Sequence, residues 1–247
     1  LKTLRKARFN SGNQSWWGHL TGSHRYLYEL PWYVIIGAPG AGKTTALVNS
    51  GLSFPLAKQF GDNAVRGAGG TRYCDWWFTN EAVFIDTAGR YTTHESDIEV
   101  DRAEWQEFLA LLKKNRARQP INGVLVTLSV AELLEKNTEQ RANHAATIRN
   151  RLDELQEGLG VAFPVYVLVT KSDLLLGFDE YFASLDKVGR EQVYGFTLPM
   201  GDASQPGIPD RQKLKEEFGL LHARIVNGLI DRLQAEPDLN RRSRIFG

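Results

Sequence analysis

The chain has 247 residues, of which 42% are hydrophobic and 24% are charged, and its formal net charge is +1. These values are typical of soluble globular domains and exclude a wholly disordered or collagen-like chain, while the single cysteine, Cys74, excludes an internal disulfide. Because acidic and basic residues balance, we expect no nucleic-acid partner. The length predicts one elaborated domain, or a core domain with a smaller appendage.

Both ends of the chain are basic. Residues 1–30 hold five Lys or Arg and one Glu, and the segment after Pro237 holds three Arg and one Asp. Solvated, frayed ends would have this composition, and so would ends near the cytoplasmic side of a membrane, where Lys and Arg accumulate. No apolar run reaches the ~18–20 residues of a membrane helix. The sequence begins at Leu1 rather than at a methionine, so we interpret it as a piece of a longer protein.

Short apolar strands alternate with helices along the predicted chain, after a polar, Gly-rich arm at residues 10–24. The patterns predict strands at residues 31–36, 74–79, 82–86, 123–130 and 165–170. They predict helices at residues 44–50, 102–114, 135–157 and about 210–234. Because the strands are apolar throughout, we expect a mostly parallel sheet covered on both faces, with 74–79 antiparallel to 82–86 at one edge.

Residues 37–44, GAPGAGKT, match the phosphate-loop pattern GxxxxGK[ST] between a predicted strand and a predicted helix. In such a loop, glycines let backbone N–H groups turn toward phosphate oxygens, Lys43 neutralises the β- and γ-phosphates, and Thr44 offers its hydroxyl to Mg²⁺. We therefore predict a nucleotide-phosphate site here. Its residues are Gly37, Ala38, Pro39, Gly40, Ala41, Gly42, Lys43, Thr44 and Thr45.

A second motif, Asp86-Thr87-Ala88-Gly89, follows the predicted strand 82–86. An aspartate at that strand end can hold the metal through water, and the N–H of Gly89 can meet a γ-phosphate. Upstream, residues 67–71 form a glycine-rich segment that ends in Thr71. Its hydroxyl is predicted to join Mg²⁺ only when a γ-phosphate is present, although an ordinary glycine hairpin would have the same sequence.

A third motif, Thr170-Lys171-Ser172-Asp173, ends the last predicted strand. In guanine-nucleotide proteins the aspartate of an [NT]KxD segment accepts hydrogen bonds from guanine, and the lysine stem lies along the base. Asp173 would then favour GTP, although its role as a helix N-cap and the use of ATP are the alternatives. Thr170 replaces the commoner Asn and lacks an amide that braces the loop, so we expect a weaker preference than in small GTPases.

The residue after the second motif differs from that of many small GTPases. Arg90 stands where those proteins have a Gln that orients the attacking water, and an Arg side chain cannot accept a hydrogen bond. It could act as an arginine finger within the chain or be a surface residue. The sequence therefore predicts slow hydrolysis, with candidate catalytic residues Lys43, Thr71, Gly89 and Arg90.

These segments resemble the cytoplasmic nucleotide-binding domain of the IcmF/TssM family, the large inner-membrane component of bacterial type VI secretion. The segments that carry the resemblance are LPWYVIIGAPGAGKTTAL, GGTRYCDWWF, VFIDTAGRY, VLVTKSD and REQVYGFTLP, within about residues 28–200. The resemblance implies two transmembrane helices before this piece, a third after it, and contact with other inner-membrane and baseplate components. It also implies a domain at the cytoplasmic face of the bacterial inner membrane, attached through flanking segments.

Together these features predict an α/β fold of the P-loop NTPase class and GTPase-like type, with a mostly parallel central sheet flanked by helices and a C-terminal helical appendage. The expected domains are a basic arm at 1–30, the GTPase-like domain at 31–200, and a helical extension with a basic tail at 201–247. The predicted function is binding and slow, Mg²⁺-dependent hydrolysis of GTP as a switch. The alternatives are a non-hydrolysing scaffold that recruits secretion partners, and an ATPase.

Overall fold

The computed structural model describes residues 28–54, 74–87, 98–198 and 211–246, and for 98–102 the backbone alone. The chain divides into two compact units, Leu1–Thr170 and Lys171–Gly247, which we name the sheet unit and the helical unit. Each is described by itself. The domain boundaries predicted at residues 30 and 200 stay predictions.

The sheet unit is built on a five-stranded mixed sheet in the order β2-β3-β1-β4-β5. Its strands are β1 (Trp32–Ile36), β2 (Cys74–Phe78), β3 (Val83–Thr87), β4 (Gly123–Ser129) and β5 (Val165–Thr170). Strand β1 is parallel to β3 and β4, and β4 is parallel to β5, whereas β2 is antiparallel to β3. The predicted sheet with one antiparallel edge is therefore confirmed, with strand ends within one residue of those predicted.

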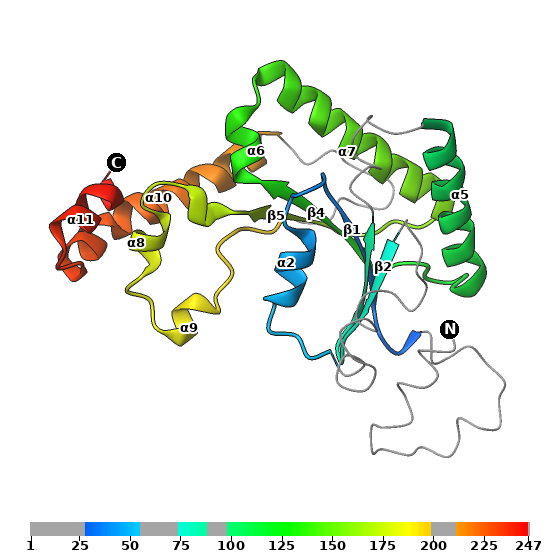
Figure 1. Cartoon of the computed structure of the whole chain (residues 1–247), viewed down its shortest axis with the longest axis horizontal. Helices are drawn as coiled ribbons and strands as arrows, with labels where there is room; N and C mark the ends of the chain where they lie inside the picture. Colours follow the sequence, from blue (N-terminus) through cyan, green and yellow to red (C-terminus); the bar gives the residue numbers. More distant parts are fainter. Residues whose placement is uncertain (1–27, 55–73, 88–97, 199–210, 247) are drawn as a thin grey trace, which may run out of the picture. The chain divides into compact units, whose positions relative to one another are not determined.

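Helices lie on both faces of this sheet (Figure 1). The short helix α2 (Lys43–Val48) is on one face, and α5 (Ile98–Asn115) and α7 (Thr138–Leu159) are on the other. Because successive strand residues point to opposite faces, Val34 packs in the large core under α5 and α7, while Ile35 packs with Leu47 of α2. The α/β architecture with flanking helices is thus confirmed.

The single helix predicted at 135–157 is wrong at its start. Two helices occupy this region, α6 (Val130–Glu135) and α7, because Lys136 and Asn137 adopt extended backbone conformations. Asn137 begins α7 with a capping box: its side chain accepts from the N–H of Gln140, and the Gln140 side chain accepts from the N–H of Asn137. The cap satisfies backbone groups that a continuous helix would have used, so the chain starts a new helix there.

The sheet was predicted to be covered on both faces, and strand β5 departs from this prediction. Its five apolar side chains, Val165 to Val169, are between 37% and 58% exposed. In the described residues β5 pairs only with β4, and the core under α5 and α7 takes side chains from β1, β3 and β4 but none from β5. An apolar strand is therefore not by itself a buried strand, because burial depends on which helices pack over it.

In its described residues the helical unit contains one 3₁₀ turn and four α-helices. These are the 3₁₀ turn η5 (Ser172–Leu174), α8 (Phe178–Phe182), α9 (Lys187–Arg190), α10 (Arg211–Ala235) and α11 (Leu239–Phe246). Helix α10 confirms the helix predicted at about 210–234. Helix α11 was not predicted, and the basic tail is helical over residues 239–246 rather than frayed.

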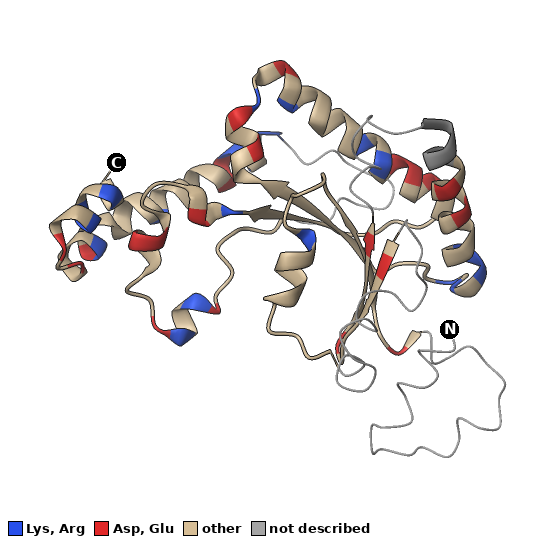
Figure 2. Cartoon of the chain, viewed as in Figure 1, with Lys and Arg blue, Asp and Glu red and all other residues tan. Residues whose placement is uncertain are grey.

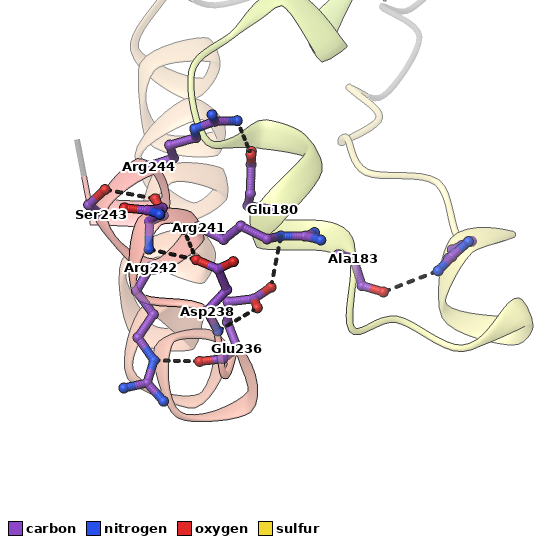
Figure 3. Close-up of polar contacts among 10 residues, drawn as sticks. Glu180, Ala183, Glu236, Asp238, Arg241, Arg242, Ser243 and Arg244 are labelled. Atoms are coloured by element: carbon purple, nitrogen blue, oxygen red, sulfur yellow. Dashed lines mark hydrogen bonds and ion pairs between the residues drawn. The ribbon is translucent and has the colours of Figure 1, made fainter.

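Directed polar contacts join the elements of this unit (Figure 3). Arg244 of α11 reaches Glu180 of α8 with its Nη1 atom 3.0 Å from the carboxylate, and Arg241 lies 3.1 Å from Glu236. The Asp238 carboxylate accepts the N–H of Asn240 at 2.7 Å and so caps α11. The arginines that make the tail basic are thus partly paired within the unit.

Charged residues lie mainly on the helices of the chain (Figure 2). Strands β1, β4 and β5 contain none, and Asp75 and Asp86 are the charged residues of β2 and β3. Of these two carboxylates, Asp75 is exposed and Asp86 is buried. Among the described helices, none is long and apolar enough to span a membrane.

Candidate functional site

The phosphate-loop sequence lies at the turn from β1 to α2, as predicted. Strand β1 ends at Ile36 and helix α2 begins at Lys43. Between them Gly40 and Gly42 have φ values of 74° and 84°, a region that glycine adopts at little cost. The N–H of Ala41 closes the turn by donating to the carbonyl of Ala38 at 3.1 Å. The loop therefore has the strand–turn–helix context that the motif requires.

Lys43 is folded back over the start of the loop. Its Nζ donates to the carbonyl oxygens of Gly37 at 2.8 Å and Ala38 at 3.1 Å, and its side chain is buried. Burial lowers the pKa of Lys43 from its ordinary value, and the nearby Asp86 opposes this shift. The loop thus holds a poorly solvated cation against its own backbone.

Asp86, at the end of β3, lies beside the start of α2. Its Oδ2 atom accepts a hydrogen bond from the Thr44 hydroxyl at 3.0 Å, while its buried Oδ1 atom has no hydrogen-bond partner among the described residues. Burial raises the pKa of Asp86, and Lys43 and Thr44 act in the opposite direction. A buried oxygen without a partner is costly unless a ligand satisfies it. With the Thr44 hydroxyl, it forms a set of oxygen atoms of the kind that Mg²⁺ prefers.

Thr170, the last residue of β5, contacts the phosphate loop directly. Its hydroxyl donates to the carbonyl of Ala41 at 2.6 Å and lies 3.2 Å from the carbonyl of Leu128. The sequence predicts that Thr170 lacks an amide that braces the loop. The structure shows that the shorter hydroxyl reaches the loop itself, because β5 ends next to it.

The other residues of the third motif belong to the helical unit. Lys171 has a φ of 59°, the left-handed conformation, and is the N-cap of η5 without a side-chain capping bond. Asp173 is exposed and lies in the first turn of η5. The alternative interpretation of Asp173 as a helix N-cap is therefore wrong.

Three predicted site residues, Thr71, Gly89 and Arg90, lie outside the described residues. Thr45, in the first turn of α2, is exposed. Two further buried threonines, not predicted as site residues, contact the strand that leads into the loop: Thr87 of β3 and Thr127 of β4. The available signal was a threonine close to the carboxyl end of each predicted strand.

Two comparisons with known proteins bear on this chain. Residues 98–247 match the family described as the IcmF-related N-terminal domain. The chain is also 53% identical over 223 residues to the type VI secretion system component TssM1 of Pseudomonas aeruginosa. The chain belongs to the IcmF/TssM family. This confirms the resemblance drawn from the sequence segments.

The alignment with TssM1 covers 90% of this chain and 20% of TssM1, so the chain spans about a fifth of the length of this relative. Because only about a tenth of the chain lies outside the alignment, the phosphate loop, Asp86 and Thr170 lie within it. The family match begins at residue 98 and does not include the loop. The similarity to TssM1 therefore extends over the loop that the family match leaves out.

Proposed function

We propose that the sheet unit of this chain has a P-loop GTPase-like fold and binds a nucleoside triphosphate with Mg²⁺. The observation that carries this proposal is the convergence of Lys43, Thr44 and Asp86 beside the glycine turn that ends β1. Strand β1 has β3 on one side and β4 on the other, so the loop lies where the connections diverge. Open α/β sheets bind ligands at such a point, outside the carboxyl ends of their strands.

In this proposal each described residue has a separate role. Lys43 neutralises phosphate charge, the Thr44 hydroxyl ligates the metal, and Asp86 holds the metal through water. The metal, when bound, neutralises charge that develops on the transferred phosphate. Thr71 and Gly89 complete the site as a metal ligand and a γ-phosphate contact, and Arg90 acts either as an arginine finger or as a surface residue.

GTP is the nucleotide that we propose. Thr170 holds the loop, and Asp173 accepts from the ring N1–H and exocyclic amine of guanine, with the Lys171 stem along the base. The absence of a Gln after Gly89 favours slow turnover. It also favours the second candidate function, a scaffold that binds nucleotide without hydrolysing it, and ATP is the alternative nucleotide.

At the level of the cell, we propose that the chain is part of a type VI secretion system. The support is its family and its identity to TssM1, which is a component of such a system. We place it in a longer protein at the cytoplasmic face of the inner membrane, where it contacts other inner-membrane and baseplate components. Its nucleotide state would act as a switch in that complex.

Titration with fluorescent GTP and ATP in the presence of Mg²⁺ tests nucleotide binding. Lys43→Ala should weaken GTP affinity about 100-fold, since it removes a charge-assisted contact worth about 2–3 kcal/mol. Lys187→Ala changes an exposed lysine of α9 and serves as the matched control. Single-turnover hydrolysis on the same samples separates the two candidates: turnover lost in Lys43→Ala supports the NTPase, and wild-type binding without turnover supports the scaffold.

Competition between GTP and ATP tests the base contact. A site that pairs with guanine rejects an adenine nucleotide because its own polar groups are left unpaired. Asp173→Asn should therefore narrow the difference between the two affinities and improve binding of xanthosine triphosphate. Equal wild-type affinities for GTP and ATP would contradict the proposed guanine specificity.

A further inference from the structure

We propose that Thr87 and Thr127 are positioning residues that, together with Thr170, hold the phosphate loop in its binding geometry before nucleotide arrives. Their hydroxyls come from three different strands and reach the backbone of β1 and of the loop. This inference rests on the proposed nucleotide binding. Thr87 and Thr127 are not among the ligands that the motifs predict.

The three hydroxyls form a series along one stretch of backbone. Thr87 of β3 donates to the carbonyl of Ile35 at 2.7 Å, and Thr127 of β4 donates to the carbonyl of Ile36 at 3.3 Å. Thr170 of β5 then donates to the carbonyl of Ala41 at 2.6 Å. Hydrogen bonds thus join the end of β1 and the loop to each described strand that is parallel to β1.

Packing alone does not explain a threonine at the two buried positions. Thr87 and Thr127 are 3% and 1% exposed, and the residues beside Thr127 in β4 are Val126 and Leu128. A valine would fill the same volume without burying a hydroxyl. Buried hydroxyls need partners, and here each partner belongs to the strand that feeds the loop.

The first loop residue fits closely against Thr127. A Cβ atom built on Gly37 would lie 2.0 Å from Oγ1 of Thr127 and 2.9 Å from its carbonyl oxygen. Only a glycine can approach β4 so closely. Gly37 and Thr127 therefore interlock, which fixes the position of the loop where it leaves the sheet.

This position matters because Lys43 is aligned by the same residues. Its Nζ bonds to the carbonyls of Gly37 and Ala38 at 2.8 and 3.1 Å. A shift of Gly37 would move the acceptors that orient the lysine, and a misplaced charged group loses much of its effect on a phosphate. Thr87 and Thr127 thus act on phosphate binding through Gly37 and Lys43, without touching the phosphate.

Thr→Val substitutions at positions 87 and 127 remove each hydroxyl at nearly constant volume, and Thr→Ser substitutions keep it. Thr79 provides a matched control, because it is also buried and its hydroxyl donates to the carbonyl of Ala82 at 2.8 Å, in the β2–β3 turn. The 247-residue chain with each substitution is compared by three measurements. These are hydrogen exchange of the loop amides without nucleotide, affinity for Mg²⁺ and fluorescent GTP, and urea unfolding.

Thr87→Val and Thr127→Val should speed exchange of the amides of residues 38 and 40–43. They should weaken GTP binding by up to about tenfold, because binding must then order a loop that the missing hydrogen bond no longer holds in place. The serine variants should stay within about twofold of the wild type. Thr79→Val should lower stability but leave loop exchange and GTP affinity unchanged. If Thr127→Val does not fold, Thr87→Val and its serine partner decide the question.

Wild-type loop exchange and affinity in both valine variants would overturn the proposal, as would equal changes in Thr79→Val. If the wild type binds no nucleotide, the proposed function fails. Loop exchange without nucleotide still decides the positioning role in that case: faster exchange in the valine variants supports it, and unchanged exchange overturns it.

Discussion

The sheet unit and the helical unit are held together in different ways. In the sheet unit, Trp105, Leu109 and Leu112 of α5 are 1% exposed and pack on strand residues that are equally buried. Among the described residues of the helical unit, the buried apolar side chains are Tyr181 and Ile245, each 9% exposed. None of the 25 residues of α10 is buried. Apolar burial therefore dominates the first unit, and directed contacts carry more of the second.

This difference predicts that the two units respond differently to mutation, pH and salt. Burial of apolar area is non-directional and responds mainly to the volume of the side chain, whereas hydrogen bonds and ion pairs depend on single atoms, on pH and on salt. The six tryptophans all precede residue 106, so tryptophan fluorescence reports the sheet unit alone. Far-UV circular dichroism reports both units, and the two signals can be compared on one sample.

The largest difference should come from the same kind of truncation in each unit. Leu109→Ala should lower the free energy of unfolding by about 2–5 kcal/mol, because it leaves a cavity in a closed core. Ile230→Ala, at a side chain that is 65% exposed, should change it by less than about 0.5 kcal/mol. Urea unfolding followed by both signals measures this, and comparable losses in the two variants would contradict the comparison.

Two glycine-to-alanine substitutions within the helical unit should change its stability in opposite directions. Gly177 has a φ of 80°, and a Cβ there would lie 2.1 Å from the carbonyl oxygen of Arg244. Gly177→Ala should therefore destabilise this unit by about 2–4 kcal/mol, from left-handed strain and overlap. Gly219 lies in α10 with nothing near its Cβ position, so Gly219→Ala should stabilise by about 0.5–1 kcal/mol.

Circular dichroism measures both glycine variants, and the fluorescence transition should not move in either. A shift of that transition would mean that the two units do not unfold separately. Gly177→Ala with wild-type stability would contradict the close packing of α8 against α11.

Removal of one hydroxyl should lower the stability of the helical unit by less than Gly177→Ala does. The Tyr181 hydroxyl donates to the carbonyl of Ile225 at 2.8 Å and so joins α8 to α10. Tyr181→Phe should destabilise the helical unit by about 0.5–1.5 kcal/mol, the net value of one hydrogen bond. Tyr194→Phe is the control, because the Tyr194 hydroxyl donates to the carbonyl of Leu221 on an exposed surface. It should lower stability by less than Tyr181→Phe. Amide exchange in α8 and α10 measures both.

Acid should loosen the helical unit before the sheet unit. A hydrogen bond from its own backbone N–H, and then the bond from Arg244, hold the pKa of Glu180 below its ordinary value of 4.5. A carboxyl whose pKa is lowered by folding adds stability above its unfolded pKa, and this is lost as the pH falls through the folded pKa. Amide protection in α8 and α11, measured against the intrinsic exchange rate at each pH, should fall as the pH falls below 4.5. Glu180→Gln should remove this pH dependence, and a persisting loss of protection would assign it to other groups.

Local patterns were sufficient for much of the fold. The strand boundaries, the antiparallel edge and the turn at residues 37–44 follow from residues adjacent in the sequence, because periodicity and glycine placement act over a few residues. The start of α7 was missed although Asn137 and Gln140 carry the spacing of a capping box. The start of this helix is therefore also encoded in neighbouring residues.

The sequence by itself determined the elements of the candidate site: a strand, a glycine turn with Lys43 and Thr44, and a carboxylate at the end of another strand. Only the tertiary structure decided which groups meet. The contacts of Thr87 and Thr127 with the backbone of β1 join residues far apart in the chain. The exposure of β5 likewise depends on which elements pack over it. Local propensity cannot encode these contacts, because a buried hydroxyl gains its partner only when strands distant in sequence become neighbours in the sheet.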